Sequence, residues 1–247
     1  SADRRDLRCL DVCSDGGVAR LGEFINRAKK VLAADNLACA SAPNAQQPEG
    51  PFYPTKNRKD KDNNLVKVDK NGGAVKGEKI LFWGRVIDQN CQPVTNALVE
   101  IWQACESGRY DHPEDADDVR ALDPNFQYWG LCHTDSSGIY FFYTILPGNY
   151  PAAENWVRPS HIHMHAQRLG YTELTTQAYF AGNPHNADDK ILSQLPPDEQ
   201  KRCTMEPSRL DKTEDAVKTK MIAEFRLSTQ DQKQLAVYQY DLAIKKL

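Results

Sequence analysis

The sequence predicts a mainly β fold, namely a β-sandwich of mixed or antiparallel strands with an N-terminal helix and long wrapping loops. From Glu78 onward, short segments alternate apolar and polar residues, which is the pattern of strands that bury one face. Turn-forming clusters such as 88–90 and 135–138 separate some of these segments. At 247 residues, the chain can bury a substantial core as a single all-β domain.

The chain before residue 48 differs in character from the rest. Apolar residues between Leu21 and Leu32 recur at helical spacing, which predicts one amphipathic helix over 18–35 that packs on the domain or on a second subunit. Residues 36–74 are polar and rich in Pro, Lys, Asp and Asn, so we expect a long wrapping loop there. We therefore divide the chain into an N-terminal extension, 1–47, with one amphipathic helix, and a β-sandwich domain, 48–247.

The strands of this domain follow in order along the chain. The alternating segments predict strands at 80–87, 97–102, 139–144, 161–166 and 175–180. The tail alternates again over M-I-A-E-F-R-L-S and L-A-V-Y-Q-Y-D-L-A-I, which predicts a final hairpin. The even spacing of the strands is typical of a sandwich.

The segment W-V-R-P-S-H-I-H-M-H, read as strand, carries the strongest functional signal. Successive strand side chains point to opposite faces, so His161 and His163 share one face, with Cβ atoms roughly 6.5–7 Å apart. Two imidazoles at that separation can bind one metal ion. Ile162 and Met164 then point toward the apolar core.

The other histidines are weaker candidates. His165 shares the face of the H-x-H pair but lies roughly 13 Å from its first member by the strand rise, so we expect it beside the site or at the surface. His112 could line the entrance of a pocket or be solvated. His133 and His185 are expected to be structural or exposed.

Two tyrosines upstream stand where loops would present them. Tyr110 follows the loop that begins at Gly108, and Tyr150 closes the turn between Pro147 and Pro151. Glycine and proline fix the backbone at such places, and loops on a rigid scaffold often carry function. Each tyrosine alone is more often an ordinary half-buried aromatic. Together with the H-x-H strand they suggest an iron site, because phenolate is a hard anionic donor suited to Fe(III).

A series of short blocks occurs in a fixed order between about residues 49 and 185. The blocks are E-G-P-F-Y-P, G-R-V-I-D, L-V-E-I-W-Q-A, G-R-Y, L-D-P-N-F, H-T-D-S-S-G-I-Y-F-F, P-G-N-Y-P, R-P-S-H-I-H and L-T-T-Q-A-Y-F-A-G-N-P. In these blocks the chain resembles the intradiol ring-cleavage dioxygenases, the non-haem Fe(III) enzymes that open catechols between the two hydroxyls. The ordered set is far more specific than any single block.

The resemblance implies a ligand set for Fe(III) that is complete in this chain. Tyr110, Tyr150, His161 and His163 match the family's four ligands. The G-R-Y tyrosine and the first histidine of the pair would be equatorial, and the other two axial. Two imidazoles, two tyrosinates and one hydroxide cancel the charge of Fe(III), which makes the centre tolerable in a low-dielectric pocket. One phenolate can then act both as ligand and as base toward an arriving catechol.

The resemblance also implies polar residues beside the substrate ring. Arg158 and Gln177 match these positions, and Arg158 is suited to stabilise negative charge that develops on the substrate. The alternative interpretation of Arg158 is that it is paired with a surface carboxylate and has no role in the reaction. Ala152 stands where some protocatechuate enzymes have tryptophan, which leaves the substrate preference open. Eleven positions separate Tyr150 from His161, a short connection like that of the protocatechuate branch, but we expect activity on catechol and simple substituted catechols.

Charge and hydropathy restrict the partners. A formal net charge of −3, a pI of about 6.1 and the lack of a long basic run argue against nucleic acid or a membrane surface. No apolar stretch approaches the ~20 residues of a membrane span. The expected partners are a catechol-type small molecule and O2, and the chain is expected to be a monomer or homo-oligomer.

The cysteines bear on the cellular compartment. There are seven, at positions 9, 13, 39, 91, 105, 132 and 203. They form no C-x-x-C pair, which argues against zinc ribbons and thioredoxin chemistry. The N-terminal cluster is most simply explained as disulfide-forming, so we expect a secreted or periplasmic protein, with the cytoplasm as the alternative. We recognise no signal peptide at Ser1, and if one existed it has been removed from this chain.

Two other functions compete with the dioxygenase. One is a catalytically inactive β-sandwich binding module of the transthyretin-like type, against which the intact tyrosine and histidine set argues. The other is a zinc-dependent hydrolase built on H-x-H, which would need a carboxylate or a third histidine as ligand.

Overall fold

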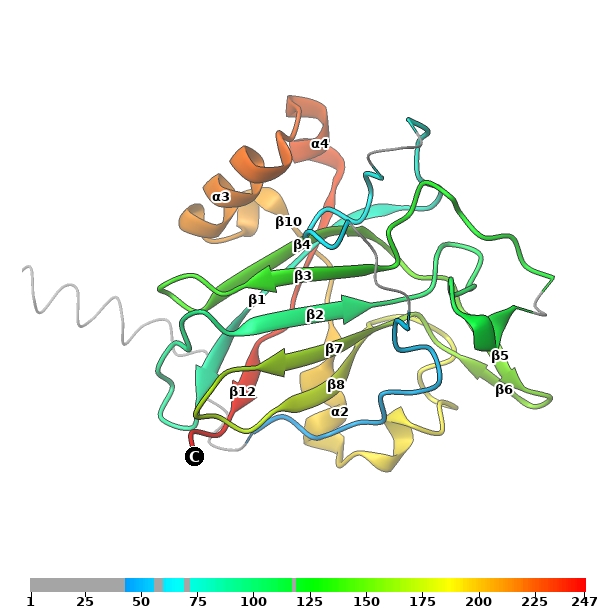
Figure 1. The fold of residues 1–247 in the computed structure, drawn as a ribbon, viewed down its shortest axis with the longest axis horizontal. Helices are drawn as coiled ribbons and strands as arrows, with labels where there is room; N and C mark the ends of the chain where they lie inside the picture. The colour runs from blue at the N-terminus through cyan, green and yellow to red at the C-terminus, as the bar shows by residue number, and fades with distance from the viewer. Residues whose placement is uncertain (1–42, 56–59, 69–71, 117–118) are drawn as a thin grey trace, which may run out of the picture. The chain divides into compact units, whose positions relative to one another are not determined.

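The structure is a computed structural model that describes residues 43–55, 60–68, 72–116 and 119–247. The helix predicted over 18–35 and nearly all of the N-terminal extension lie outside the described residues. Within the described part, the predicted mainly β fold is confirmed, with strands gathered into two five-stranded sheets and one small hairpin (Figure 1).

The first sheet is built around one long strand. β1 (Lys79–Asp88) pairs antiparallel with β4 (Ile139–Ile145) along one edge. Along its other edge β1 pairs in parallel with β11 (Ala236–Gln239) and then with β12 (Leu242–Ile244). β10 (Ser208–Arg209) continues the sheet beyond β11.

The second sheet carries the H-x-H strand near its centre. Its strands are β3 (Trp129–His133), β2 (Leu98–Trp102), β7 (His161–Gln167), β8 (Leu174–Phe180) and β9 (Thr204–Met205), in that spatial order. The first three pairings are antiparallel and the last is parallel. The sheet is therefore mixed, as the sequence predicts.

A two-stranded hairpin lies beside the second sheet. It consists of β5 (Tyr150–Ala153) and β6 (Trp156–Arg158). The segment predicted as one strand from Trp156 onward is therefore two strands, because β6 ends before Pro159 and β7 begins at His161. Proline has no N–H for a ladder, so the chain turns there and changes sheet.

The main core fills the space between the two sheets. It includes Phe82 of β1, Phe142 of β4 and Ile101 of β2, all fully buried. Ile162 and Met164 are also fully buried in this core, which confirms their predicted direction. By strand alternation the flanking histidines must then point to the opposite face of the second sheet.

Short helices lie mainly in the chain after β8, and a short 3₁₀-helix lies earlier, between β2 and β3. The α-helices are α2 (Pro197–Cys203), α3 (Asp215–Phe225) and α4 (Thr229–Gln234), and the 3₁₀-helices are η1 (Pro113–Asp115), η2 (Leu192–Gln194) and η3 (Leu210–Lys212). α3 packs Val217, Met221 and Phe225 into a second core on the outer face of the first sheet, with Leu81 and Trp83 of β1. Figure 1 shows α3 and α4 together beside β4.

The predicted final hairpin is wrong. The first of its two segments forms the last turns of α3, because its apolar residues continue a four-residue spacing from Val217 through Met221 to Phe225, which buries one helix face. The second segment forms β11 and β12, which pair with β1 and not with each other.

The described cysteines fall into two groups. Cys91 is disulfide-bonded, whereas Cys105, Cys132 and Cys203 are free thiols. The N-terminal cysteines lie outside the described residues. None of the helices in the described segments is long and apolar enough to cross a membrane.

Candidate metal centre

Four buried side chains from three separate segments converge on one point. Tyr110 lies in the loop after β2, Tyr150 is the first residue of β5, and His161 and His163 open β7. The two imidazole Nε2 atoms are 3.1 Å apart, and the Tyr110 hydroxyl oxygen is 3.5 Å from Nε2 of His161. The ring of Tyr150 is 5.6 Å from that of Tyr110 and 5.7 Å from that of His161. The structure thus brings together all four predicted ligand residues.

The two imidazoles are fixed by their surroundings. Nδ1 of His161 lies 2.6 Å from the carbonyl oxygen of Pro159, which can only accept, so Nδ1 carries the proton and the lone pair of Nε2 faces the centre. The ring of His163 stacks on Trp102 at 4.9 Å and 10°. On this side the chain approaches closely at Gly50, where a Cβ would lie 3.4 Å from Cε1 of His163.

The electrostatics of the four groups suit a highly charged cation. Burial, with the charge of Arg158, holds the pKa of His161 and of His163 well below the usual range, so both rings are neutral donors. Burial raises the pKa of Tyr110 and Tyr150, so a phenolate forms here only when a strong positive charge compensates it. Two neutral nitrogens and two potential phenolate oxygens, with neighbouring donors 3.1 and 3.5 Å apart, fit an ion with bond lengths of about 2 Å.

The tyrosine backbones are held by polar side chains. The amide of Tyr110 donates to Asp115 at 2.7 Å, and Phe52 stacks on its ring at 4.5 Å. The sequence predicts Tyr150 in a loop, but this is wrong. Tyr150 is the first residue of β5 and pairs with Arg158 of β6. The turn before it is tied to the start of β7, because the amide of Ser160 donates to Asn149 Oδ1 at 2.7 Å.

Arg158 lies within a buried polar network behind the centre. Its Nε donates to Asp189 Oδ1 at 2.9 Å, and its Nη2 donates to Gln177 Oε1 at 2.6 Å and to the Tyr179 hydroxyl at 3.3 Å. Arg158 pairs with a carboxylate, but the alternative of a surface carboxylate is wrong, since Asp189 is fully buried. Burial opposes the charge of Arg158, but Tyr150, Tyr179 and Asp189 raise its pKa, so it stays cationic.

The oxygen and the nitrogen of the Gln177 side-chain amide both have hydrogen-bond partners within the protein. Oε1 accepts from Arg158 and, at 3.1 Å, from the Tyr179 hydroxyl, while Nε2 donates to the carbonyl of Pro48 at 2.9 Å. Gln177 therefore links the 43–55 segment to Arg158. Its position supports the arginine rather than presenting a free amide to a ligand.

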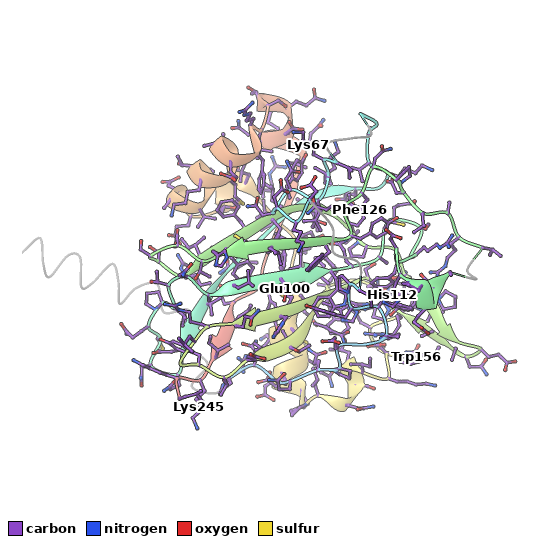
Figure 2. The ribbon with its side chains drawn as sticks, in the orientation of Figure 1. Lys67, Glu100, His112, Phe126, Trp156 and Lys245 are labelled. Atoms are coloured by element: carbon purple, nitrogen blue, oxygen red, sulfur yellow. The ribbon has the colours of Figure 1, made fainter. Side chains whose placement is uncertain are left out.

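The remaining histidines stand apart from this centre. Nδ1 of His165 lies 3.2 Å from Glu100, and Nδ1 of His112 accepts from the amide of Glu114. His133 is exposed and His185 is half-buried. Figure 2 shows Glu100 on β2 and His112 toward the β5–β6 hairpin.

The described ranges contain no cluster of three or more His, Cys, Asp and Glu side chains that could hold a metal. A zinc hydrolase on H-x-H would need such a cluster. The donor set observed here is instead two imidazoles and two phenols.

Sequence reasoning missed two residues of this site. Phe52 lies in the E-G-P-F-Y-P block, so the block itself was a usable signal. Asp189 lies in an irregular segment after β8, and nothing in its local sequence separates it from the exposed Asp188 before it.

Comparison with known proteins gives a consistent result. The sequence model of the family described as "Dioxygenase" matches residues 48–246. The protocatechuate 3,4-dioxygenase beta chain of Burkholderia cepacia is 36% identical over 199 residues, which cover 79% of this chain and 76% of that protein. The catechol 1,2-dioxygenase of Acinetobacter baylyi is 31% identical over 132 residues, which cover 48% of this chain and 41% of that protein.

Solved structures share the fold. The dioxygenase domain of a dioxygenase–carbohydrate-binding fusion from Streptomyces sp. SirexAA-E superposes with a TM-score of 0.55 at 25% identity, over 83% of this chain and all of that one. Hydroxyquinol 1,2-dioxygenase from Pseudomonas putida DLL-E4 superposes with a TM-score of 0.62 at 20% identity, over 94% of this chain and 73% of that one. The second likeness concerns the fold alone.

Proposed function

The chain belongs to the intradiol ring-cleavage dioxygenases, a family of oxidoreductases, and from this premise we propose that it is a non-haem Fe(III) enzyme. It cleaves catechol-type rings between the two hydroxyls with O2 and gives cis,cis-muconate-type diacids. The observation that carries this proposal is the convergence of two neutral imidazoles and the Tyr110 phenol within 3.1–3.5 Å contacts, with the ring of Tyr150 5.6 Å from that of Tyr110 and 5.7 Å from that of His161. An inactive binding module has no need of that donor set.

In this proposal, Tyr110, Tyr150, His161 and His163 hold the iron. When bound, Fe(III) withdraws electron density from a catechol and makes its ring carbon reactive toward O2. The protein supplies two neutral imidazole nitrogens, with the tautomer of His161 fixed by Pro159, and two phenols whose protons the cation would displace. Burial of all four side chains excludes bulk water and strengthens the electrostatic interactions inside the site.

Tyr150 is the residue that takes a proton from the catechol. Tyr150 faces Arg158 across the β5–β6 pairing, and the charge of Arg158 lowers the pKa of Tyr150 against the effect of burial, so a proton can move to and from the phenol oxygen. Arg158 stabilises negative charge that develops on the substrate. Gln177 and Tyr179 hold the arginine, so we assign Gln177 a supporting role rather than a direct contact with substrate.

The substrate class follows from the family, and its details remain a proposal. We propose catechol and simple substituted catechols as substrates, with O2 as co-substrate and a monomer or homo-oligomer as the active form. We also propose that the protein is secreted or periplasmic, because a disulfide at Cys91 persists in oxidising compartments.

The test is product analysis with a panel of catechols under ¹⁸O2. We expect the ultraviolet absorbance of a muconate and a diacid that carries two labelled oxygen atoms, one at each new carboxyl group. A yellow semialdehyde would contradict both the iron oxidation state and the cleavage position. An iron-loaded protein that converts none of the catechols would favour the binding-module alternative.

A further inference from the structure

The Arg158 guanidinium is held by a carboxylate that has no contact with solvent. Arg158 is 3% exposed and Asp189 is 0% exposed, and Nε lies 2.9 Å from Oδ1. Exposed ion pairs contribute little to stability, whereas an unpaired charge in such a place is costly. Arg158 and Asp189 must therefore be present together.

The carboxylate of Asp189 is itself immobilised. Oδ1 also accepts from the indole Nε1 of Trp156 at 3.0 Å, and Oδ2 accepts from the backbone amide of Leu192 at 3.0 Å. These donors come from β6 and from the start of η2. Because the carboxylate is held in this way, the chain after β8 determines where the guanidinium of Arg158 lies.

The contacts of Arg158 divide into two sides. Asp189, Gln177 and Tyr179 take up Nε and Nη2, while Tyr150 faces Arg158 across the β5–β6 pairing. The guanidinium is planar with a rigid fork of donors. Fixing its Nε edge therefore fixes the direction of the opposite edge.

We propose that Asp189 is a positioning residue of the ring-cleavage reaction, which orients the Arg158 guanidinium toward Tyr150 and the bound substrate. The inference rests on the proposed function. Among the described residues, the Asp189 carboxylate is bonded to Trp156, Arg158 and the amide of Leu192 and not to the four ligand side chains, so it acts through Arg158. A small misplacement of a positioned group can cost about 10²-fold in rate, and we expect Asp189→Asn to lower kcat by about 10–100-fold.

The experiment compares Asp189→Asn with Asp188→Asn in the iron-loaded protein. Asp188 is the exposed neighbour, so its substitution removes the same charge without the buried contacts. We expect Asp189→Asn to keep the iron content, the visible tyrosinate absorption and the anaerobic affinity for catechol within twofold, while kcat falls and KM stays nearly constant. Asp188→Asn should behave as wild type.

A double variant separates positioning from a general structural effect. If Asp189 acts through Arg158, then Arg158→Gln/Asp189→Asn should have the kcat of Arg158→Gln alone, because no arginine remains to be oriented. Independent, multiplicative losses would overturn the inference. As a readout apart from activity, the Arg158 Nε–H signal of the Ga(III)-loaded protein should lose its protection from solvent exchange in Asp189→Asn.

The outcomes distinguish this inference from the proposed function. A wild-type protein that cleaves no catechol contradicts the proposed function itself. An active wild type with an equally active Asp189→Asn variant overturns only the role of Asp189. Should Asp189→Asn fail to fold, Trp156→Phe removes one hydrogen bond from the same carboxylate and should lower kcat several-fold, and an unchanged kcat would overturn the inference.

Discussion

At the scale of single residues, the site depends on which atoms carry protons. The carbonyl of Pro159 fixes the tautomer of His161, and burial keeps both imidazoles neutral. Tyr110 and Tyr150 differ in their contacts although both are buried. Tyr110 is covered by Phe52 and held at its amide by Asp115, whereas Tyr150 faces Arg158 across the β5–β6 pairing, and the charge of Arg158 lowers its pKa against the effect of burial. This difference supports the proposed roles, with Tyr110 as the permanent ligand and Tyr150 as the proton acceptor.

The first prediction concerns Tyr150→Phe. The variant should retain iron through the three remaining ligands but lose the base, so kcat should fall by orders of magnitude, in the range of about 10²–10⁴ for a positioned acid–base group. Iron content and kcat are measured on the same preparation. Tyr53→Phe serves as control, because the Tyr53 hydroxyl is bonded to Glu100 and not to the centre. Iron and activity that fall in parallel would contradict the assignment.

At the scale of elements, tight turns connect one sheet to the other. The β3–β4 turn is an example: Asp135 Oδ1 accepts from the amides of Ser137 and Ile139 at 2.8 and 3.0 Å. Gly138 has φ +72°, and a Cβ there would lie 2.6 Å from the carbonyl oxygen of Val86, so only glycine fits. The same carboxylate is paired with Lys220 of α3, which ties the β3–β4 turn to the helix that covers the first sheet.

The second prediction is the pH dependence of Asp135→Asn. Partial burial opposes the charge, but Lys220 and the amides of Ile139 and Ser137 lower the pKa of Asp135 below its usual value. A lowered folded pKa gives stability that is present above the unfolded pKa of about 3.9 and is lost as pH falls through the folded value. At pH 7 the free energy of unfolding of Asp135→Asn should be about 1 kcal/mol lower than that of the wild type. Urea unfolding measured from pH 7 to pH 3 should show that this difference in the free energy of unfolding disappears below about pH 4.

The exposed Asp188 provides the control for this measurement, since Asp188→Asn should leave the free energy of unfolding unchanged at every pH. A gap between wild type and Asp135→Asn that stays constant down to pH 3 would mean that the carboxylate charge plays no part in the turn.

At the scale of the whole molecule, the site is a meeting point of distant segments. The loop after β2, the β5–β6 hairpin and the start of β7 each contribute ligand residues. The 43–55 segment covers the site. Gln47 donates to Thr176 and Gln177 of β8, and Phe52 stacks on Tyr110. A metal bound there joins these segments, so binding should stabilise the entire domain.

The third prediction is that Fe(III) raises the melting temperature of the metal-free protein. A ligand at 1,000 times its Kd stabilises the folded state by about 4 kcal/mol, which corresponds to roughly 8–16 °C for a domain of this size. Ga(III), which has a similar charge but no redox chemistry, should raise the melting temperature comparably without visible colour or turnover. Scanning calorimetry of the metal-free, Ga(III) and Fe(III) forms makes the comparison. Identical melting temperatures would contradict a shared metal centre.

The sequence by itself determined much of the candidate site. Strand alternation placed His161 and His163 on one face and Ile162 in the core, since a strand has a fixed period of two. The ordered blocks pointed to Tyr110 and Tyr150. These inferences succeed because each depends on local geometry or on a motif whose residues are close along the chain.

Only the tertiary structure decided the remainder. The partner of Arg158 is Asp189, thirty-one positions away, and a buried carboxylate cannot be told from an exposed one until the segments that cover it are known. The 221–228 segment alternates over a short window, but α3 begins at Asp215, and the helical face becomes evident only when it packs on Leu81 and Trp83. Burial and pairing are properties of contacts between distant segments, so the local pattern does not contain them.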